Sequence, residues 1–275
     1  IMFTPAEVAK NVIGIGKNKA ALPAGRMLVL SIMAGIFIAL AAVGSNTISC
    51  TVESGSIAKI LSGLVFPTGL TMVLLAGSEL FTGNCLMVIP LIEREIKLKA
   101  MLRNWIIVYI GNFIGALLVT VLVYYGGQLD LFAGALAVNT IKVAAGKTSL
   151  TFVKGFCLGI LCNFLVCIAV WISFAATTVA GKIVGLFLPI MLFILCGFEH
   201  SVANMYYGMA GLLANTNEVY HAAAAETVSN IGNLTAGNFF IGNLLPVTLG
   251  NIVGGSVLVG CVYWFSYLKK DGEGR

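Results

Sequence analysis

Six apolar runs, each long enough to cross a lipid bilayer, constrain the fold of this chain more than any other feature of its sequence. A transmembrane helix needs about 20 consecutive, predominantly apolar residues. Charged residues make up only 10% of the 275-residue chain, against about a quarter in ordinary soluble domains. We therefore expect an all-α integral membrane protein with six transmembrane helices, over Met27–Ser49, Ile60–Ile92, Asn104–Gly126, Phe152–Val179, Ile183–Ala214 and Phe240–Leu268.

The distribution of lysine and arginine predicts how the chain is oriented in the membrane. With six spans, both termini and the loops at 93–103 and 180–182 lie on one side, which collects twelve of the sixteen basic residues. By the positive-inside rule, both termini are predicted to be cytoplasmic, with the protein in the cell membrane. The net charge of +5 then reflects topology, so we expect the lipid bilayer rather than a nucleic acid as a partner. The other side holds four lysines, Lys59, Lys142, Lys147 and Lys154.

The segments outside the six spans are too short to form a soluble domain. Residues 1–26 are expected to be a cytoplasmic segment that forms an amphipathic helix on the membrane surface, since Val8, Val12 and Ile15 share one helical face. Residues 27–268 are expected to form a single six-span domain, and residues 269–275 a cytoplasmic tail.

Two of the predicted spans are too long for straight helices. Ile60–Ile92 has 33 residues and Ile183–Ala214 has 32, so each would extend about 50 Å against a hydrocarbon core of about 30 Å. Near its middle, each span contains the pattern G-x-E-x-x-x-x-N, at 77–84 and at 197–204. Irregular backbone at membrane depth is tolerated only inside protein or beside a watery cavity. We therefore expect the second and fifth helices to be broken at these two octapeptides.

A second shared pattern indicates an internal repeat. The motif N-x6-G-N-x2-G begins at Asn104 in the third span and at Asn243 in the sixth. Each half, 27–126 and 152–268, then carries a plain span, a broken span and a span with this motif. Three spans per half imply opposite insertion, and inverted repeats with interrupted helices place the substrate path between the halves. Close helix approach, either between the halves or between subunits, is permitted by the small residues Gly111, Gly115, Gly250, Gly254 and Gly255.

Ionisable side chains away from the ends of the predicted spans are few, namely Glu79, Glu199 and His200. A charge at the bilayer centre costs about 2.5–3.5 kcal/mol on insertion scales, so such residues are candidates for function. For the two glutamates a structural role is favoured, because a carboxylate can accept hydrogen bonds from backbone N–H groups freed by a broken helix. Asn84 and Asn204 are their expected partners where each helix restarts.

His200 is favoured as a working residue, although a lone buried histidine is more often structural. The first half has Leu80 at the corresponding position, so the histidine is not part of the repeat. Imidazole changes charge near neutral pH and can donate a hydrogen bond or a proton to an anion. The other histidine, His221, lies in a predicted outer loop, where solvation explains it.

Neither a metal nor a cofactor is expected. Nearly all of the seven cysteines lie within apolar spans, where a free thiol behaves as a small hydrophobic group. No pair of them has the spacing of a zinc site with a histidine nearby.

These motifs give the sequence a resemblance to the formate/nitrite transporter family, from Ala24 to Leu268. The resemblance rests on six spans with broken second and fifth helices, on Glu79-Leu-Phe-Thr-Gly-Asn84, on Gly197-Phe-Glu-His-Ser-Val-Ala-Asn204, and on Cys162-Asn163 in the fourth span. It implies an aquaporin-like protomer, a homopentamer with one pore per protomer, and passage of small monovalent anions such as formate, nitrite or hydrosulfide.

The resemblance also implies which residues line the pore. The polar residues would be Thr82 facing His200 across a central chamber, with Asn163 and Lys147 as partners of the histidine. The apolar constrictions would be Phe66 with Phe193 on the outer side, and Leu70 with Leu80 toward the cytoplasm. Without the resemblance, Lys147 is interpreted equally well as a solvated loop lysine, and Phe66, Leu70 and Phe193 as core- or lipid-facing residues.

Two other classes of function compete with an anion channel. An aquaporin-like channel for ammonia or a neutral solute would share the broken helices, although the Asn-Pro-Ala motif of aquaporins is absent and a lysine at the entrance favours anions. A membrane enzyme would need a third group to orient Glu199 and His200, whose adjacent side chains diverge by about 100° on a helix. We therefore expect a transport protein and no enzymatic activity.

Overall fold

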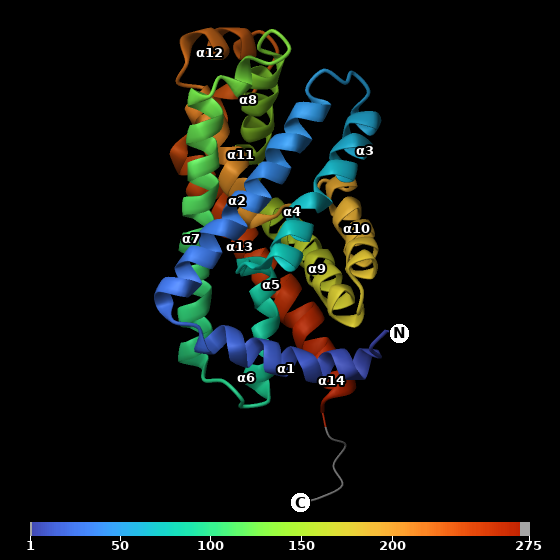
Figure 1. Ribbon diagram of the computed structural model, residues 1–275. Helices are drawn as coiled ribbons and strands as arrows, with labels where there is room; N and C mark the ends of the chain where they lie inside the picture. The colour runs from blue at the N-terminus through green and yellow to red at the C-terminus, as the bar shows by residue number, and fades with distance from the viewer. Residues whose placement is uncertain (1, 270–275) are drawn as a thin grey trace, which may run out of the picture.

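The computed structural model describes residues 2–269, and α-helix dominates it (Figure 1). Five of the described helical segments are long and apolar enough to cross a membrane, namely Ala24–Ser49, Gly55–Gly77, Leu98–Tyr125, Phe152–Ala175 and Asn238–Tyr267. Two shorter apolar helical segments, Phe81–Ile92 and Val179–Leu195, accompany them. The expectation of an all-α chain with membrane-spanning helices is confirmed. Of the predicted tail at 269–275, residues 270–275 lie outside the described part of the chain.

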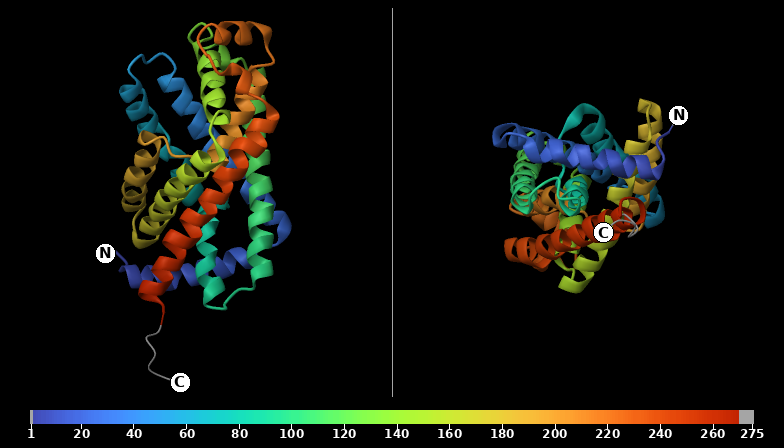
Figure 2. Two further views of the ribbon diagram at one scale, coloured as in Figure 1. Left: turned by 180° about the vertical axis from the view of Figure 1, so that it is seen from behind. Right: turned by 90° about the horizontal axis from the view of Figure 1, so that it is seen from below.

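Helix α1 (Pro5–Ala21) crosses one end of the molecule, where α6 (Val88–Ile92) and α14 (Val262–Tyr267) also lie (Figures 1 and 2). It begins at a capping box, in which the Thr4 hydroxyl accepts from the Glu7 N–H and the Glu7 carboxylate accepts from the Thr4 N–H. This reciprocal pair satisfies backbone donors that the first turn leaves free.

The apolar face of α1 packs against protein. Val8 and Val12 are buried, and a Cβ atom added to Gly16 would collide with the ring of Pro90 in α6. The face that was expected to rest on the membrane surface is therefore occupied by the end of the helical bundle.

Helices α2 (Ala24–Ser49) and α7 (Leu98–Tyr125) pack so closely that only glycine fits at their contact. A Cβ atom on Gly35 would overlap the carbonyl of Asn112, and one on Gly115 would overlap the carbonyl of Ile32. The glycine face of the third predicted span is thus used against the first span of the same half, and not between the halves.

The same contact recurs between α9 (Phe152–Ala175) and α13 (Leu245–Ile252) together with the π-helical turns that follow α13. Here a Cβ atom on Gly250 would overlap the carbonyl of Phe156, and one on Gly254 would overlap that of Ile160. Helix α13 continues from π-helical turns over Asn238–Leu244 into π-helical turns over Val253–Cys261.

Helical structure is interrupted at both octapeptides. The segment α3 (Gly55–Val65), α4 (Pro67–Met72) and the π-helical turns Val73–Gly77 ends before residues 78–80, and α5 (Phe81–Asn84) follows. Likewise, α10 (Val179–Leu195) ends before residues 196–200, and α11 (Ser201–Ala214) follows. Gly77 has φ +89° and Gly197 has φ +68°, a left-handed conformation that a residue without a Cβ atom adopts readily. The first helical segment therefore ends at Gly77, and α10 ends two residues before Gly197.

A second, smaller hydrophobic core lies at the end of the molecule opposite α1. It joins α8 (Ala135–Thr148) to α12 (Glu218–Ala225), as Figure 1 shows at the upper end. Short 3-10 turns at Gln128–Asp130 and Ile231–Asn233 border this core, and on the other side of the bundle a 3-10 turn at Cys85–Met87 links α5 to α6.

We expect Gly115→Ala to destabilise the protein, because its new methyl group meets the carbonyl oxygen of Ile32 and forces α7 away from α2. Overpacking of this kind costs about 1–3 kcal/mol. The matched control is Gly25→Ala in α2, where nothing lies within 4 Å of the added atom and the helix gains propensity. Chemical unfolding in detergent measures both; equal stability of the two variants would contradict the close contact.

Candidate functional site

The first interruption is built around the buried carboxylate of Glu79. Its Oε1 atom accepts from Lys19 Nζ at 2.8 Å, and its Oε2 atom accepts from Asn84 Nδ2 at 2.7 Å. Asn84 Nδ2 also donates to Asn104 Oδ1 at 2.9 Å. Lys19 comes from the last turn of α1, so the carboxylate ties that helix to the interruption.

Asn112 holds the free backbone on both sides of the same interruption. Its Oδ1 atom accepts from the Phe81 N–H at 3.0 Å, at the start of α5. Its Nδ2 atom donates to the carbonyl of Glu79 at 2.9 Å and to that of Ser31 at 2.7 Å. Backbone groups released by the interruption thereby find buried partners, as a water-poor environment requires.

The second interruption repeats the carboxylate contacts with the same residue types. Glu199 Oε1 accepts from Lys147 Nζ at 2.8 Å, and Glu199 Oε2 accepts from Asn204 Nδ2 at 2.6 Å. Asn204 Nδ2 donates to Asn243 Oδ1 at 2.9 Å, as Asn84 does to its own partner. Both carboxylates are therefore engaged by one lysine and by the asparagine of the octapeptide, and Glu199 Oε2 also accepts from Asn243 Nδ2 at 3.4 Å.

Asn251 repeats the backbone contacts of Asn112. Its Oδ1 atom accepts from the Ser201 N–H at 2.8 Å, and its Nδ2 atom donates to the carbonyls of Glu199 at 3.0 Å and Gly159 at 2.8 Å. The two asparagines of each N-x6-G-N motif thus belong to the interruptions, a link that the motif alone did not indicate.

Lys19 is the site residue that sequence reasoning missed. It occupies the place in the first network that Lys147 occupies in the second. A signal for it exists in the sequence: Lys19 and Lys147 each stand three residues before a leucine, Leu22 or Leu150, just ahead of a plain span. The network therefore begins before residue 27, outside the half that was expected to start there.

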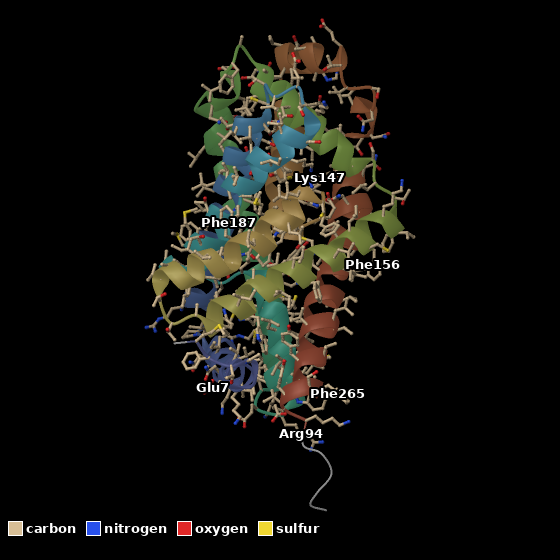
Figure 3. All side chains as sticks on the ribbon, turned by 90° about the vertical axis from the view of Figure 1, so that its right-hand side faces the viewer. Glu7, Arg94, Lys147, Phe156, Phe187 and Phe265 are labelled. Atoms are coloured by element: carbon tan, nitrogen blue, oxygen red, sulfur yellow. The ribbon has the colours of Figure 1, made fainter. Side chains whose placement is uncertain are left out.

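Lys147 lies in the last turn of α8 and is mostly buried, so it is not a solvated loop lysine. Figure 3 places it at mid-height of the molecule, far from Glu7 and Phe265 at one end. Its ammonium group pairs with Glu199 and stands 5.1 Å from the ring centroid of Tyr207.

Thr82 and His200 bring the two interruptions into direct contact. The Oγ1 atom of Thr82 lies 2.9 Å from Nε2 of His200, and both side chains are buried. His200 is also the N-cap of α11, where its Nδ1 atom accepts from the Ala203 N–H at 3.0 Å. Because Nδ1 accepts, the proton of the neutral ring is on Nε2, which then donates to Thr82.

Asn163 supports the backbone of Thr82. Its Nδ2 atom donates to the Thr82 carbonyl at 3.1 Å and to the Asn251 carbonyl at 2.6 Å. Cys167, one turn further along α9, places its Sγ atom 3.3 Å from the same Thr82 carbonyl. Both amide hydrogens of Asn163 are therefore engaged with backbone, next to the Thr82–His200 pair.

The four apolar residues predicted as constrictions are buried. The rings of Phe66 and Phe193 meet edge to face, with centroids 5.4 Å apart. Phe193 also stacks on His200, at 6.0 Å between ring centroids. Leu80, the residue before α5, lines one cavity together with Leu70.

Each interruption borders a cavity. The larger, of about 290 Å³, is lined by Phe193, Lys147 and His200, among others. The smaller, of about 40 Å³, is lined by Leu70 and Leu80 and is bordered by residues of α1. A lysine of the two networks faces each cavity, Lys147 the larger and Lys19 the smaller.

Comparisons with known proteins agree with one another. The model of the formate/nitrite transporter family matches residues 6–265. A probable formate transporter of Methanothermobacter thermautotrophicus is 38% identical, over 97% of this chain and 98% of its own length. The formate channel FocA of Escherichia coli K12 is 35% identical, over 98% of this chain and 96% of its own. A solved pentameric formate channel with formate bound is 35% identical and superimposes with a TM-score of 0.80, over 90% of this chain and 98% of that one.

We expect Glu199→Leu to destabilise the protein by about 3 kcal/mol or more, because Lys147 would keep its charge in a buried place without a partner. The double variant Lys147→Met with Glu199→Leu removes both charges and is expected to recover part of this loss. The control is Glu95→Gln, at an exposed ion pair with Lys17, where a change below about 1 kcal/mol is expected. Denaturant titration in detergent gives the free energy of unfolding of all three variants. If Glu199→Leu were as stable as the control Glu95→Gln, a structural role for the Glu199 carboxylate would be refuted.

Proposed function

The chain belongs to the formate/nitrite transporter family, as its motifs predicted, and we propose that it is a membrane channel for small monovalent anions of weak acids. Formate is the first candidate, because the two relatives described above, at 38% and 35% identity, are named a probable formate transporter and a formate channel. Nitrite and hydrosulfide are the other candidates of the same chemical class. The observation that carries the proposal is the hydrogen bond between Thr82 and His200, where two interrupted helices meet.

The proposed path runs from the larger cavity, past Thr82 and His200, to the smaller one. Phe66 with Phe193 would form the constriction on the side of the larger cavity, and Leu70 with Leu80 the one on the side of the smaller. A bare anion between apolar side chains loses its hydration without compensation, so both constrictions oppose the charged form. Lys147 lines the larger cavity and Lys19 the smaller, but each is paired with a glutamate, so these two ion pairs add no net charge at the approaches.

At the centre of this path, hydrogen bonding replaces the water that the anion has lost. The Nε2–H of His200 and the hydroxyl of Thr82 are the two donors that an anion between them would use, in place of their present bond to each other. Asn163 contributes indirectly, because it holds the backbone of Thr82. This assignment makes Thr82 and His200 the binding residues, and Asn163 a positioning residue.

The cap bond of His200 limits what the ring can do as an acid. A neutral ring that gave up its Nε2 proton would become an anion, so proton donation requires that Nδ1 is protonated first. Nδ1 accepts from the Ala203 N–H, and protonation would break this bond at the start of α11. In the conformation of this structure His200 therefore acts as a hydrogen-bond donor, and proton transfer to the anion requires release of the cap.

Membership of this family also guides our proposal for the topology and the assembly of the protein. We propose that the two interrupted segments belong to inverted halves, that the assembly is a homopentamer with one pore in each protomer, and that both termini are cytoplasmic. The repeated contacts of Glu79 and Glu199 support the first, and the solved pentameric formate channel supports the second. The excess of basic residues at the termini supports the third.

Thr82→Val and His200→Phe are each expected to lower formate flux into liposomes by at least about tenfold, or to change its dependence on pH, because each removes a donor to the anion. His200→Asn is the matched variant, since asparagine is a good N-cap but does not titrate. Flux retained by His200→Asn without pH dependence would assign the pH dependence to the ring. Wild-type flux and pH dependence in Thr82→Val and His200→Phe, with assembly unchanged, would show the site assignment to be wrong.

Leu80→Ala separates a constriction from a packing residue, because the two roles predict effects of opposite sign. Shortening a constriction lowers the dewetting barrier, so we expect higher anion flux per assembled protein and weaker selectivity against larger anions. A packing residue would instead leave a void that costs about 2–5 kcal/mol, with less folded protein and no gain in flux. Stopped-flow flux, normalised to oligomer measured by size-exclusion chromatography, decides between them.

A further inference from the structure

A cavity of about 350 Å³ lies between α3, α8 and the second interruption, and its lining carries more positive than negative charge. Its lining residues include Lys59, Lys142 and Lys147 and a single acidic residue, Glu199. We call this cavity the lysine pocket. Its lining also includes the amide residue Asn139.

The carboxylate in the lysine pocket is already engaged. Glu199 uses one oxygen for Lys147, and its other oxygen accepts from Asn204 and Asn243. Lys59 and Lys142 are exposed, and neither forms an ion pair with any residue in the range 2–269. Within residues 2–269, two positive charges in the pocket therefore have no ion-pair partner of their own.

The repeated network does not explain these two lysines. Lys147 has its counterpart in Lys19 of the other network. Lys142 lies five residues before Lys147, and the corresponding position, five residues before Lys19, is Gly14. Lys59 lies twenty residues before Glu79, and the corresponding position, twenty residues before Glu199, is Val179. A basic residue at the opposite end, Lys182, lines a different cavity, together with Gly14. Lys59 and Lys142 are thus additions to the scaffold that the two halves share.

Lys59 connects the lysine pocket to the proposed path. It lines the lysine pocket and also the cavity of about 290 Å³ that His200 lines. A Cβ atom added to Gly197 would lie 3.6 Å from Lys59 Nζ, so the ammonium group stands at the second interruption itself. An anion held by Lys59 and Lys142 is therefore one step from the cavity in which Lys147 and His200 lie.

We propose that the lysine pocket is a capture site, in which Lys59 and Lys142 bind a small monovalent oxyanion before it reaches Thr82 and His200. The inference rests on the proposed function, since it concerns how the same anion arrives. One elementary charge at about 7 Å changes the local concentration of a monovalent anion in water about threefold. The attraction reaches about 30 Å at 0.01 M salt and only about 3 Å at 1 M. At low ionic strength, capture therefore lowers the anion concentration at which flux is half-maximal. The maximal flux is set by Thr82 and His200 and does not change.

The test measures initial formate flux, over a range of formate concentrations, into vesicles of zwitterionic phosphatidylcholine. At about 0.01 M ionic strength, Lys59→Gln and Lys142→Gln are each expected to raise the half-saturating concentration about threefold with unchanged maximal flux. At about 1 M salt both are expected to match the wild type. Lys59→Arg, which keeps the charge, is expected to match it throughout. Lys154→Gln is the control, because it removes the same charge from the first turn of α9 and lines neither cavity.

Several results would overturn the capture site. Half-saturation in both glutamine variants equal to that of Lys154→Gln would show that the two charges do not recruit anions. A lower maximal flux with unchanged half-saturation would make the lysines structural. If the variants differ from the wild type only in vesicles that contain phosphatidylglycerol, the pocket binds the phosphate of a lipid headgroup instead. Absence of anion flux in the wild type would refute the proposed function itself, a result distinct from the other three.

Discussion

A buried carboxylate that is paired with one lysine and accepts hydrogen bonds from asparagine is the contact on which the two interruptions depend. Ending a helix at membrane depth frees backbone N–H and C=O groups, and no water is available there to receive them. Glu79 and Glu199 are buried beside the freed segments, and Asn112 and Asn251 bond the backbone on both sides of the gap. The carboxylates would be unfavourable alone, but each is neutralised by a lysine at 2.8 Å. Charge and backbone are satisfied together, so the interruption is stable only as a unit.

The two networks repeat, but the residues that meet between them do not. At corresponding positions the first interruption has Leu80 and Thr82, and the second has His200 and Val202. The same hydrogen-bonded frame thus presents one polar side chain from each half, and these two lie 2.9 Å apart. A strict repeat would have placed either two polar or two apolar groups at the centre. The departures from the repeat therefore mark the two polar side chains that meet at the centre, and the repeat marks the residues that hold them.

The lysine of each network also couples the interruption to a helix outside the apolar spans. Lys19 belongs to α1, whose buried face packs on α6, and Lys147 belongs to α8, which forms the second hydrophobic core with α12. A displacement of α1 would separate Lys19 from Glu79, and the carboxylate would then lose its cation in a buried place. Because breaking a buried pair is unfavourable, the position of α1 and the state of the first interruption are energetically linked.

The sequence by itself determined which segments are apolar enough to span a membrane, where two of them are interrupted, and which family the chain belongs to. These properties are local: they follow from the length of apolar runs, from a glycine followed two residues later by glutamate, and from motifs within a few residues. Only the tertiary structure showed which side chains are ion-pair and hydrogen-bond partners and which helices are in contact. It assigned Lys147 to Glu199 and Asn163 to the backbone of Thr82, it brought in Lys19, and it placed the glycines between helices of the same half. Thr82 and His200 are 118 residues apart, and no periodicity reaches that far. Which polar groups meet at the centre depends on how the helices pack, because buried groups at membrane depth can find their partners only through that packing.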